Sequence, residues 1–457
     1  MVKNEKFQIK ITDLSSNGEG IGKTKEGYTI FVKGAVIGDE IEGFLMKAKK
    51  TYGFGKMTNI LCPSKDRILP PCPVAQKCGG CQIQSLSYQK QLDFKLNKVV
   101  GNLKHIGGIE DYELEGITGM ENPYRYRNKA QYPVGRGKDG EIQIGFYAGH
   151  THSIIANEAC LLSPQINEKI LGLIHAWMDK YEIEPYHEEV HRGLLRHILI
   201  RSGFTSGQIM VCLVINGNSL PCREELVEML SGLSEIKSIC YSVNTKKTNV
   251  ILGDNVHPIF GPTTIEDFIG AIRFKISPLS FFQVNPLQTK KLYEKALEYA
   301  GLTGEETVWD MYCGIGSISL FLAQKAKKVY GVEIVPRAIE DARKNAKLNN
   351  ILNAEFFVGK AEEVVPAFTE RNKEKIDVVV VDPPRKGCEE ILLATIVKMA
   401  PKRMVYVSCD SATLARDLKY MEGERYHVEK VAIFDQFPHS THVETVVLMS
   451  KVNTVKG

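Results

Sequence analysis

The chain has 457 residues and a net charge of +4 at pH 7; 43% of its residues are hydrophobic and 25% are charged. This composition is that of a globular protein, and it excludes a membrane-spanning chain because no apolar run is long enough to cross a bilayer. The length exceeds one ordinary hydrophobic core, so we expect two or three domains, and the small positive charge permits an anionic polymer as partner without requiring one.

The first ten residues, MVKNEKFQIK, are charged from the third residue onward and lack the apolar centre of a secretory signal. We therefore expect a cytoplasmic protein. Its 11 cysteines are then expected to be reduced thiols, metal ligands or a catalytic thiol rather than a disulfide framework.

Residues 1–60 predict a small all-β unit. Glycines punctuate short strand-like runs such as YTIFV (28–32) and the alternating DEIEGFLM (39–46). A glycine-rich barrel with a lysine-rich rim can serve as a platform for nucleic acid, although lysines on a barrel surface are equally often solvated without a partner.

A cysteine array follows a proline-rich break. Cys72, Cys78 and Cys81 form the pattern C-x5-C-x2-C, and Cys160 follows further along the chain. Thiolates this close, with two glycines that let the backbone wrap around them, favour a tetrahedral metal ion or an iron–sulfur cluster. Their spacing alone does not separate these two kinds of site.

Residues 87–103 place apolar side chains at helical spacing and predict a helix. Residues 120–275 predict mostly strands and hairpins, with a helix near 222–233. Within them, NPYRYRNKAQYPVGRG (122–137) interleaves tyrosines with basic residues, a pattern typical of surfaces that stack on unpaired bases and contact phosphates. Side chains that alternate along a strand also alternate between its two faces, so one set can instead belong to a core.

From about residue 276 the pattern changes to strands alternating with helices. Short apolar runs such as TVWDMY, VYGVEI, EFFVG, DVVVVD and MVYVSC are separated by helical stretches such as RAIEDARKNAKLNN. This alternation predicts an α/β fold with a Rossmann-like parallel sheet, preceded by the N-terminal β-barrel and a β-rich central domain. We expect the three domains to span 1–60, 61–275 and 276–457.

A glycine turn follows the first of these strands, in WDMYCGIGSISLFLA (309–323). Its glycines, among them Gly314, let a cofactor approach the backbone, but Ser319 occupies the place of the third glycine in the dinucleotide-binding pattern. Glu333 ends the next strand, where its carboxylate can accept hydrogen bonds from both hydroxyls of a ribose. Together these features favour a nucleoside cofactor such as S-adenosylmethionine over NAD.

Two further strands end on polar or reactive side chains. DVVVVDPPRKG (377–387) places Asp382 before two prolines, which can form a stiff wall beside a cofactor or simply stop the strand. MVYVSCD (404–410) places Cys409 at a strand end, as either a small apolar plug or a nucleophile. Because parallel strands end at a shared edge, we expect the glycine turn, Asp382 and Cys409 to converge there.

A thiol beside a methyl donor suits methylation of an unreactive ring carbon. Addition of a thiolate to C6 of uracil makes C5 nucleophilic, and a base must then remove the C5 proton so that elimination frees the cysteine. We assign this base to Glu444, which opens the last strand near His439 and His442. The alternative for Glu444 is a charge that discourages edge-strand pairing.

Five motifs together resemble those of the RNA (uracil-5)-methyltransferases: FFQVN (281–285), DMYCGIG (310–316), DPPRKG (382–387), SCD (408–410) and FPHSTHVE (437–444). The cysteine array and the glycine-rich N-terminal stretch are similar to the iron–sulfur and TRAM parts of the branch that acts on 23S rRNA. The resemblance covers almost the whole chain.

The resemblance implies that Cys409 is the nucleophile and Glu444 the proton acceptor. For the cofactor site it implies the following residues, to which the glycine turn adds Gly314: Gln283, Tyr312, Glu333 and Asp382. It also implies a [4Fe-4S] cluster, with these ligands: Cys72, Cys78, Cys81 and Cys160.

The sequence therefore predicts a cytoplasmic, S-adenosylmethionine-dependent enzyme that forms 5-methyluridine in 23S rRNA. The substrate is expected to be an unpaired loop or bulge, because the base must leave its stack; no membrane and no obligate protein partner is expected. Alternatives are a tRNA methyltransferase of the same chemistry and a non-catalytic RNA-binding or ribosome assembly factor. A cytosine-C5 methyltransferase is disfavoured because Ser408, rather than proline or threonine, precedes Cys409.

Overall fold

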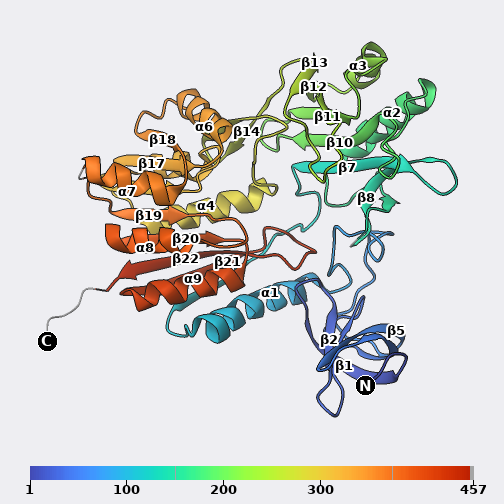
Figure 1. Cartoon of the computed structure of the whole chain (residues 1–457), viewed down its shortest axis with the longest axis horizontal. Coiled ribbons are helices and arrows are strands. Elements are labelled where there is room, and N and C mark those ends of the chain that lie inside the picture. Colours follow the sequence, from blue (N-terminus) through green and yellow to red (C-terminus); the bar gives the residue numbers. More distant parts are fainter. Residues whose placement is uncertain (150, 373, 453–457) are drawn as a thin grey trace.

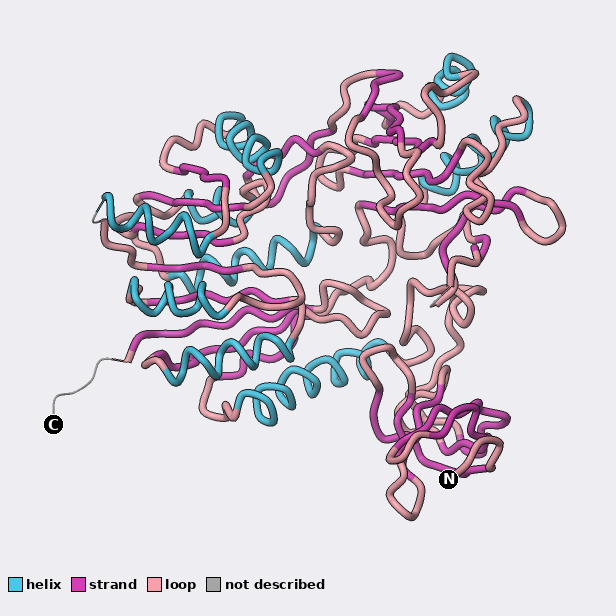
Figure 2. The backbone as a smooth tube through the Cα atoms, in the orientation of Figure 1, coloured by secondary structure: helices cyan, strands magenta, loops and turns pink. Residues whose placement is uncertain are grey.

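The computed structural model describes residues 1–149, 151–372 and 374–452. Along the chain it forms a barrel, a central sheet and a C-terminal sheet flanked by helices (Figure 1). Long stretches without helix or strand join these parts, as the loop segments of Figure 2 show. The predicted α/β fold class with an N-terminal barrel is confirmed. Among the described residues, no helix is both long and apolar enough to cross a membrane.

The N-terminal barrel is built from five short strands. They are β1 (Lys6–Leu14), β2 (Gly20–Lys23), β3 (Thr29–Val32), β4 (Glu40–Ala48) and β5 (Tyr52–Cys62). The barrel closes in the order β1-β2-β3-β5-β4. Alternate residues of β1, namely Phe7, Ile9 and Ile11, are buried in its core. Gly55 leaves room for this core, because a Cβ there would lie 2.6 Å from the Phe7 ring.

The central sheet has seven strands and is mostly antiparallel. They are β7 (Lys129–Arg136), β8 (Ile142–Tyr147), β9 (Ile154–Ala156), β10 (Leu195–Ser202), β11 (Ile209–Ile215), β12 (Ile236–Val243) and β13 (Val256–Phe260). Their order is β13-β12-β11-β10-β7-β8-β9, in which β11 and β12 pair in parallel. A separate hairpin, β14 (Ile265–Ile269) and β15 (Ile272–Ile276), leads toward the C-terminal sheet.

Two helices pack on the central sheet. α3 (Arg223–Ser231) confirms the helix predicted near 222–233. α2 (Ile166–Lys180) is a helix that we did not predict, although its sequence carries the signal. Ile170, Ile174 and Trp177 follow helical spacing and are all buried in the core of this sheet.

The C-terminal sheet has eight strands, seven of which come from the C-terminal part of the chain. Those seven are β16 (Thr307–Met311), β17 (Lys328–Glu333), β18 (Ala354–Val358), β19 (Val378–Val381), β20 (Arg403–Ser408), β21 (Tyr426–Phe434) and β22 (Glu444–Lys451). α4 (Pro286–Ala300) precedes them, and the helices between them are α5 (Ser317–Ala323), α6 (Pro336–Leu348), α7 (Ala361–Asn372), α8 (Glu390–Met399) and α9 (Ser411–Gly423). The predicted alternation of strands and helices is thus present.

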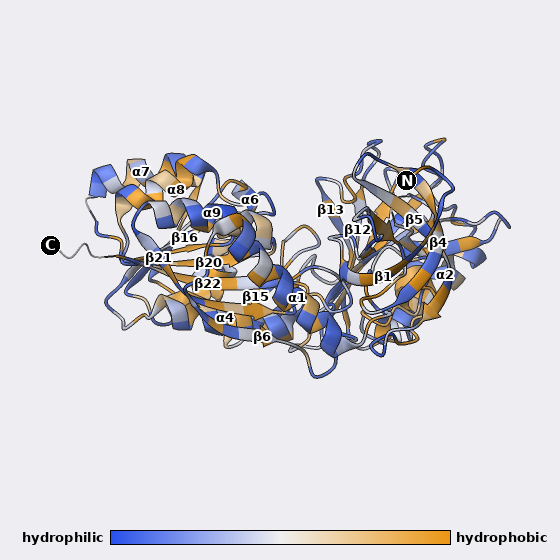
Figure 3. Cartoon of the chain, turned by 90° about the horizontal axis from the view of Figure 1, so that it is seen from below, coloured by the Kyte–Doolittle hydropathy of each residue, from blue (hydrophilic) through white to orange (hydrophobic). Residues whose placement is uncertain are grey.

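Strands β18-β17-β16-β19-β20 of this sheet are parallel, and β22 pairs antiparallel between β20 and β21. Both faces are buried: Val308 packs in the core that includes side chains of α4, α5 and α6, while the next residue, Trp309, packs in the core on the side of α7, α8 and α9. Figure 3 shows largely hydrophobic strands between the helices. Burial on both faces explains why these strands are continuous apolar runs in the sequence.

Two elements that precede the central sheet in the sequence pack with the C-terminal sheet instead. α1 (Tyr88–Asn102) is the predicted helix, and it continues into a π-helical turn (Leu103–Gly107) that packs beside α9. β6 (Glu113–Thr118) is the eighth strand and pairs in parallel with β21 at the sheet edge. The range 61–275 therefore contributes one helix and one strand to the sheet that carries the candidate site.

Candidate active site

The carboxyl ends of β16, β17, β19 and β20 meet at one edge of the C-terminal sheet, where a cavity of about 1100 Å³ opens. Open parallel sheets hold their ligands at this edge. The cavity is lined by all of the residues that the sequence assigned to the cofactor or to catalysis, which are Gln283, Tyr312, Gly314, Glu333, Asp382, Cys409 and Glu444. Residues from five separate sequence motifs thus share one cavity.

The turn after β16 forms part of the cavity wall. Tyr312, Gly314 and Gly316 all have positive φ angles, of 69°, 55° and 79°; glycine adopts this conformation without strain, whereas a tyrosine does so only when its surroundings hold it. The Gly314 amide donates to Glu333 Oε2 at 3.3 Å, and the Val335 amide donates to Oε1 at 3.0 Å. These two bonds hold the Glu333 carboxylate beside the turn, facing the cavity.

Gln283 reaches the cavity from the loop before α4, and the central part of the chain holds that loop. The Asn128 side-chain amide donates to the Gln283 carbonyl oxygen at 2.9 Å, and the Asn128 backbone amide donates to the Val284 carbonyl oxygen at the same distance. The position of Gln283 therefore depends on residues more than a hundred positions away in the sequence.

Asp310 lines the same cavity and was missed by the sequence analysis. It is completely buried at the end of β16, where Ser319 Oγ donates to its Oδ2 at 2.5 Å and no described group donates to its Oδ1. Burial, with a smaller contribution from Asp382, raises the pKa of Asp310 to about 7. The sequence feature that could have identified Asp310 is its place as an acid near the end of the strand that leads into the glycine turn.

Cys409 lies between β20 and α9, and the helix start determines its position. Asp410 caps α9, accepting hydrogen bonds on Oδ1 from the amides of Ala412 and Thr413 at 3.0 and 3.1 Å. Ser408 Oγ accepts a hydrogen bond from the Asp410 amide at 3.1 Å. The partly exposed thiol between them faces the cavity rather than filling the core, so the interpretation as an apolar plug does not hold.

Acidic groups dominate the surroundings of this thiol. Burial, then the charges of Glu444 and Asp382, raise the pKa of Cys409 to about 12, and Arg385 opposes this. Burial raises the pKa of Asp382 to about 7. Burial and then Asp382 also raise the pKa of Glu444 well above its usual range. Several buried acids that share one cavity favour a ligand that brings positive charge.

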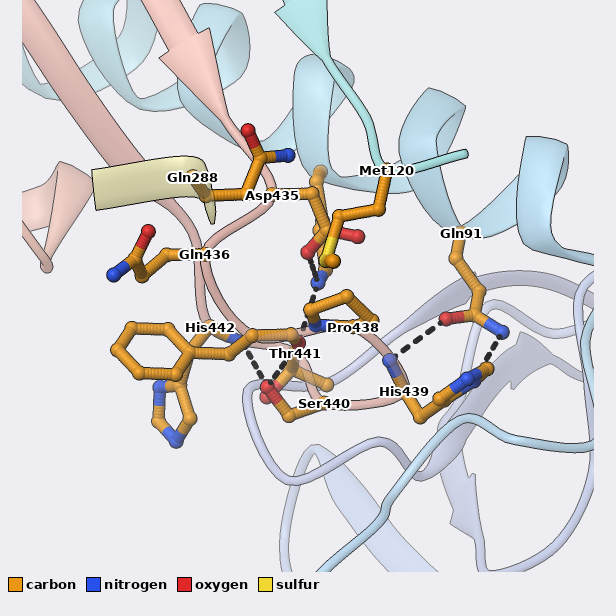
Figure 4. A network of polar contacts seen from close by, with 12 residues as sticks. Gln91, Met120, Gln288, Asp435, Gln436, Pro438, His439, Ser440, Thr441 and His442 are labelled. Atoms are coloured by element: carbon orange, nitrogen blue, oxygen red, sulfur yellow. Dashed lines mark hydrogen bonds and ion pairs between the residues drawn. The ribbon is translucent and has the colours of Figure 1, made fainter. Parts of the chain in front are cut away.

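The segment 435–444, which ends on Glu444, is held by side chains of α1, from which Gln91 reaches toward His439 in Figure 4. Lys95 and Asp435 form an ion pair at 2.5 Å in which both side chains are fully buried. The Lys95 ammonium group also donates to the Phe437 carbonyl oxygen at 3.0 Å, and Lys98 donates to the Thr441 carbonyl oxygen at 3.0 Å. Because β22 starts directly after this segment, these bonds help to position Glu444.

His439 connects the same segment to the cysteine array. Its amide donates to Gln91 Oε1 at 3.0 Å (Figure 4), and its carbonyl oxygen accepts from the amides of Gln82 and Ile83 at 3.0 and 3.1 Å. Burial lowers the pKa of both His439 and His442 to about 4, so both imidazoles are neutral at pH 7. His442 lines the cavity, whereas His439 is buried away from it and stacks on Tyr124.

The four predicted metal ligands line a second, separate cavity of about 320 Å³: Cys72, Cys78, Cys81 and Cys160. All four are free thiols. Burial raises the pKa of Cys72, Cys78 and Cys81. The Gly80 amide donates to Cys78 Sγ at 3.4 Å and the Gln84 side chain donates to Cys81 Sγ at 3.8 Å, and such N–H donors stabilise a thiolate once it forms. In the part of the chain that the structure describes, no three His, Cys, Asp or Glu side chains stand as close together as a single metal ion requires.

The interleaved segment 122–137 is divided between the core and the surface of the central domain. Tyr126 and Tyr132 are buried, and the Tyr126 hydroxyl donates to the Pro438 carbonyl oxygen at 3.1 Å. Arg125 pairs with Glu168 at 2.8 Å. The alternative reading, in which one set of these side chains belongs to a core, is the correct one for the two tyrosines.

Comparison with known proteins supports this arrangement along the whole chain. The tRNA (uracil-5-)-methyltransferase family model matches residues 269–452, and the TRAM domain model matches residues 3–58. A protein of Clostridium tetani, described as an uncharacterized RNA methyltransferase, is 51% identical over 98% of this chain and 97% of its own length. A Clostridium acetobutylicum protein with the same description is 50% identical over 99% of this chain and 98% of its own length.

Among solved structures, the chain is similar to the Pyrococcus abyssi tRNA (uracil-54, C5)-methyltransferase, crystallised in complex with S-adenosyl-L-homocysteine. The TM-score is 0.78 at 29% sequence identity, and the match covers 97% of this chain and 100% of the other. The similarity therefore includes the barrel and the central sheet as well as the sheet that carries the larger cavity.

Proposed function

Because the chain belongs to the S-adenosylmethionine-dependent RNA (uracil-5-)-methyltransferase family, we propose that it methylates C5 of a uridine in 23S rRNA through a covalent bond between Cys409 and C6 of the base. The observation that carries this proposal is that the Cys409 thiol and the Glu444 carboxyl line one cavity with the residues assigned to the cofactor. A nucleophile, a base and a cofactor must share such a space for the reaction to proceed.

In the proposed reaction, the Cys409 thiolate adds to C6, and the electron pair of the C5–C6 bond moves toward O4 as an enolate. S-adenosylmethionine supplies the methyl group that C5 attacks. Glu444 then takes the proton from C5, and the electron pair left behind restores the C5–C6 double bond as the bond between sulfur and C6 breaks. The products are 5-methyluridine, S-adenosylhomocysteine, the free Cys409 thiolate and a Glu444 carboxyl that carries the proton from C5.

The pKa of Cys409 is about 12, so its thiol holds its proton in the ligand-free protein at pH 7, and burial and Asp382 raise the pKa of Glu444 well above its usual range. The sulfonium group of the cofactor carries a positive charge, and a positive charge in this cavity lowers the pKa of the Asp382 and Glu444 carboxyls. Together with Arg385, it also favours the Cys409 thiolate. We therefore expect cofactor binding to bring the site into its reactive ionisation state.

For the cofactor, we propose that Glu333 accepts hydrogen bonds from the two ribose hydroxyls, since its carboxylate is held at the cavity edge by backbone amides. Gly314 lets the cofactor approach the turn, and Tyr312 and Asp382 flank it. Gln283 approaches from the loop before α4 and offers an amide to the same space.

We propose that the four cysteines of the second cavity hold a [4Fe-4S] cluster. Their free thiols and the N–H donors at two of the sulfur atoms fit thiolate ligands. The four ligands of one zinc ion lie about 2.3 Å from it and so crowd together, whereas a cluster spreads its ligands over the corners of a larger group. Iron and acid-labile sulfide analysis tests this proposal; zinc in stoichiometric amount would exclude the cluster.

For the substrate, we propose an unpaired uridine of 23S rRNA, reached in the cytoplasm, with the TRAM barrel (1–60) and the central domain (61–275) contacting the surrounding RNA. The cysteine array supports this choice because it resembles that of the rRNA branch of the family. The second candidate is tRNA, which is favoured by the similarity to the Pyrococcus abyssi tRNA enzyme over nearly the full length of both chains.

The covalent mechanism is tested with Glu444→Gln and Cys409→Ala. Glu444→Gln should allow addition and methyl transfer but block removal of the proton, so a denaturing gel should show protein shifted by bound RNA. Cys409→Ala should bind cofactor normally, form no adduct and lose turnover. Near-normal methylation by Cys409→Ala would rule out the thiol mechanism.

The substrate is tested by methylating purified 23S rRNA and tRNA in parallel, each lacking 5-methyluridine, and mapping the product by mass spectrometry. We expect methylation of 23S rRNA. Methyl transfer to tRNA alone would select the second candidate while leaving the chemistry intact.

A further inference from the structure

The cavity that contains the four cysteines is also lined by two basic side chains, Arg127 and Lys129. No carboxylate among the described residues lines it; its remaining wall is formed by small, apolar and amide side chains. A partly enclosed space with two positive charges, four thiols and no acid suits an anionic occupant.

Two other basic residues of the same segment, Arg125 and Arg136, each form an ion pair with a glutamate. Arg125 pairs with Glu168 at 2.8 Å, and Arg136 pairs with Glu184 at 3.1 Å. Arg127 and Lys129 have no acidic partner within ion-pair distance among residues 1–149, 151–372 and 374–452. Both side chains line the same cavity as the four thiols, so the cations share this space with them.

The charges match those of a four-thiolate group. Four thiolates around a doubly positive [4Fe-4S] core leave two net negative charges, and Arg127 and Lys129 supply two positive ones. Four thiolates around a zinc ion leave the same net charge, so this count does not depend on which metal is present. A buried group with net negative charge and no counter-charge would be strongly disfavoured.

We propose that Arg127 and Lys129 are the counter-charges of the cysteine-bound group, which keep it bound and raise its reduction potential. This inference rests on the proposed cluster. The proposal assigns to Arg127 and Lys129 of the interleaved segment a role that is independent of RNA binding. Removal of a positive charge beside a cluster makes the addition of an electron less favourable, so neutral side chains should shift the potential to more negative values.

The experiment compares neutral with charge-keeping variants in the full-length protein: Lys129→Met with Lys129→Arg, and Arg127→Gln with Arg127→Lys. Arg136→Gln is the matched control, because Arg136 lies on β7 but pairs with Glu184 at the surface. The readouts are iron per chain, the rate of iron loss to a chelator, and the midpoint potential from an anaerobic titration. Binding of S-adenosylhomocysteine checks that the cavity lined by Cys409 and Glu444 is intact.

Each neutral variant should lower the equilibrium constant of one-electron reduction at least about tenfold, which is about 59 mV, and lose iron faster. The charge-keeping variants and Arg136→Gln should behave like the unmodified protein. If iron is present and neutral and charge-keeping variants agree, the counter-charge is refuted while the cluster stands. If zinc is found instead, the cluster is refuted, and faster zinc loss from the neutral variants decides the counter-charge. A protein that binds neither metal refutes both.

Discussion

Asp310→Asn should stabilise the ligand-free protein above pH 7 and leave its stability almost unchanged near pH 4. The carboxyl of Asp310 is completely buried, and its pKa is raised from the ordinary 3.8 to about 7. Between these two values the unfolded chain has lost this proton while the folded chain still holds it, so folding stability falls as pH rises. Above pH 7 both states have lost the proton, and the loss of folding free energy caused by the buried Asp310 charge stays constant. At 1.36 kcal/mol per pKa unit, a shift of about three units corresponds to about 4 kcal/mol.

The assay is thermal unfolding of both proteins without cofactor, from pH 4 to pH 9. The Tm advantage of Asp310→Asn should grow through this range by about 1 °C for each kcal/mol, given an unfolding entropy of about 2.1 cal/mol/K per residue over 457 residues, and level off above pH 7. Asp254→Asn is the control, because the Asp254 side chain is 87% exposed and stays in water in both states. An Asp310→Asn advantage that is the same at every pH, or that shrinks as pH rises, would refute the reasoning.

Three further outcomes are expected. Alkylation of Cys409 by iodoacetamide should accelerate about tenfold per pH unit between pH 7 and 10, because its pKa is about 12; a plateau below pH 9 would contradict that value. Lys95→Met should lower the free energy of unfolding in urea by about 3–5 kcal/mol, since it leaves the Asp435 charge buried and unpaired; adding Asp435→Leu should restore part of this, and no restoration would refute the pairing. Gln91→Leu should lower kcat while leaving S-adenosylhomocysteine affinity unchanged, because it removes the acceptor of the His439 amide; weaker affinity would instead indicate general disorder.

Much of the candidate site could be predicted because its residues lie in short local motifs. A glycine turn, a strand-end acid and a strand-end thiol each require only that a strand be recognised and that its end be located. In a parallel sheet those ends meet at one edge whatever the loops between them do. Gly314, Asp382 and Cys409 therefore converge as the sequence alone indicated.

Asp310 shows where this reasoning is incomplete. The same rule applies to it, because it also lies at the end of a strand before the glycine turn. Its raised pKa follows from complete burial, and its Oδ1 has no described hydrogen-bond donor. Neither property can be predicted from the sequence around Asp310. Burial of a polar group is decided by the neighbours that pack over it.

The sequence by itself determined the three kinds of architecture along the chain, the cavity edge and the chemistry placed there, because hydrophobic period and turn residues act over a few positions. Only the tertiary structure decided that β6 completes the C-terminal sheet, that Tyr126 faces inward, and that His439 links the segment 435–444 to the cysteine array. Each of these features depends on which segment, far away in the sequence, packs against a given face of a strand or loop. An alternating pattern states that two faces differ, but only packing determines which of them is buried.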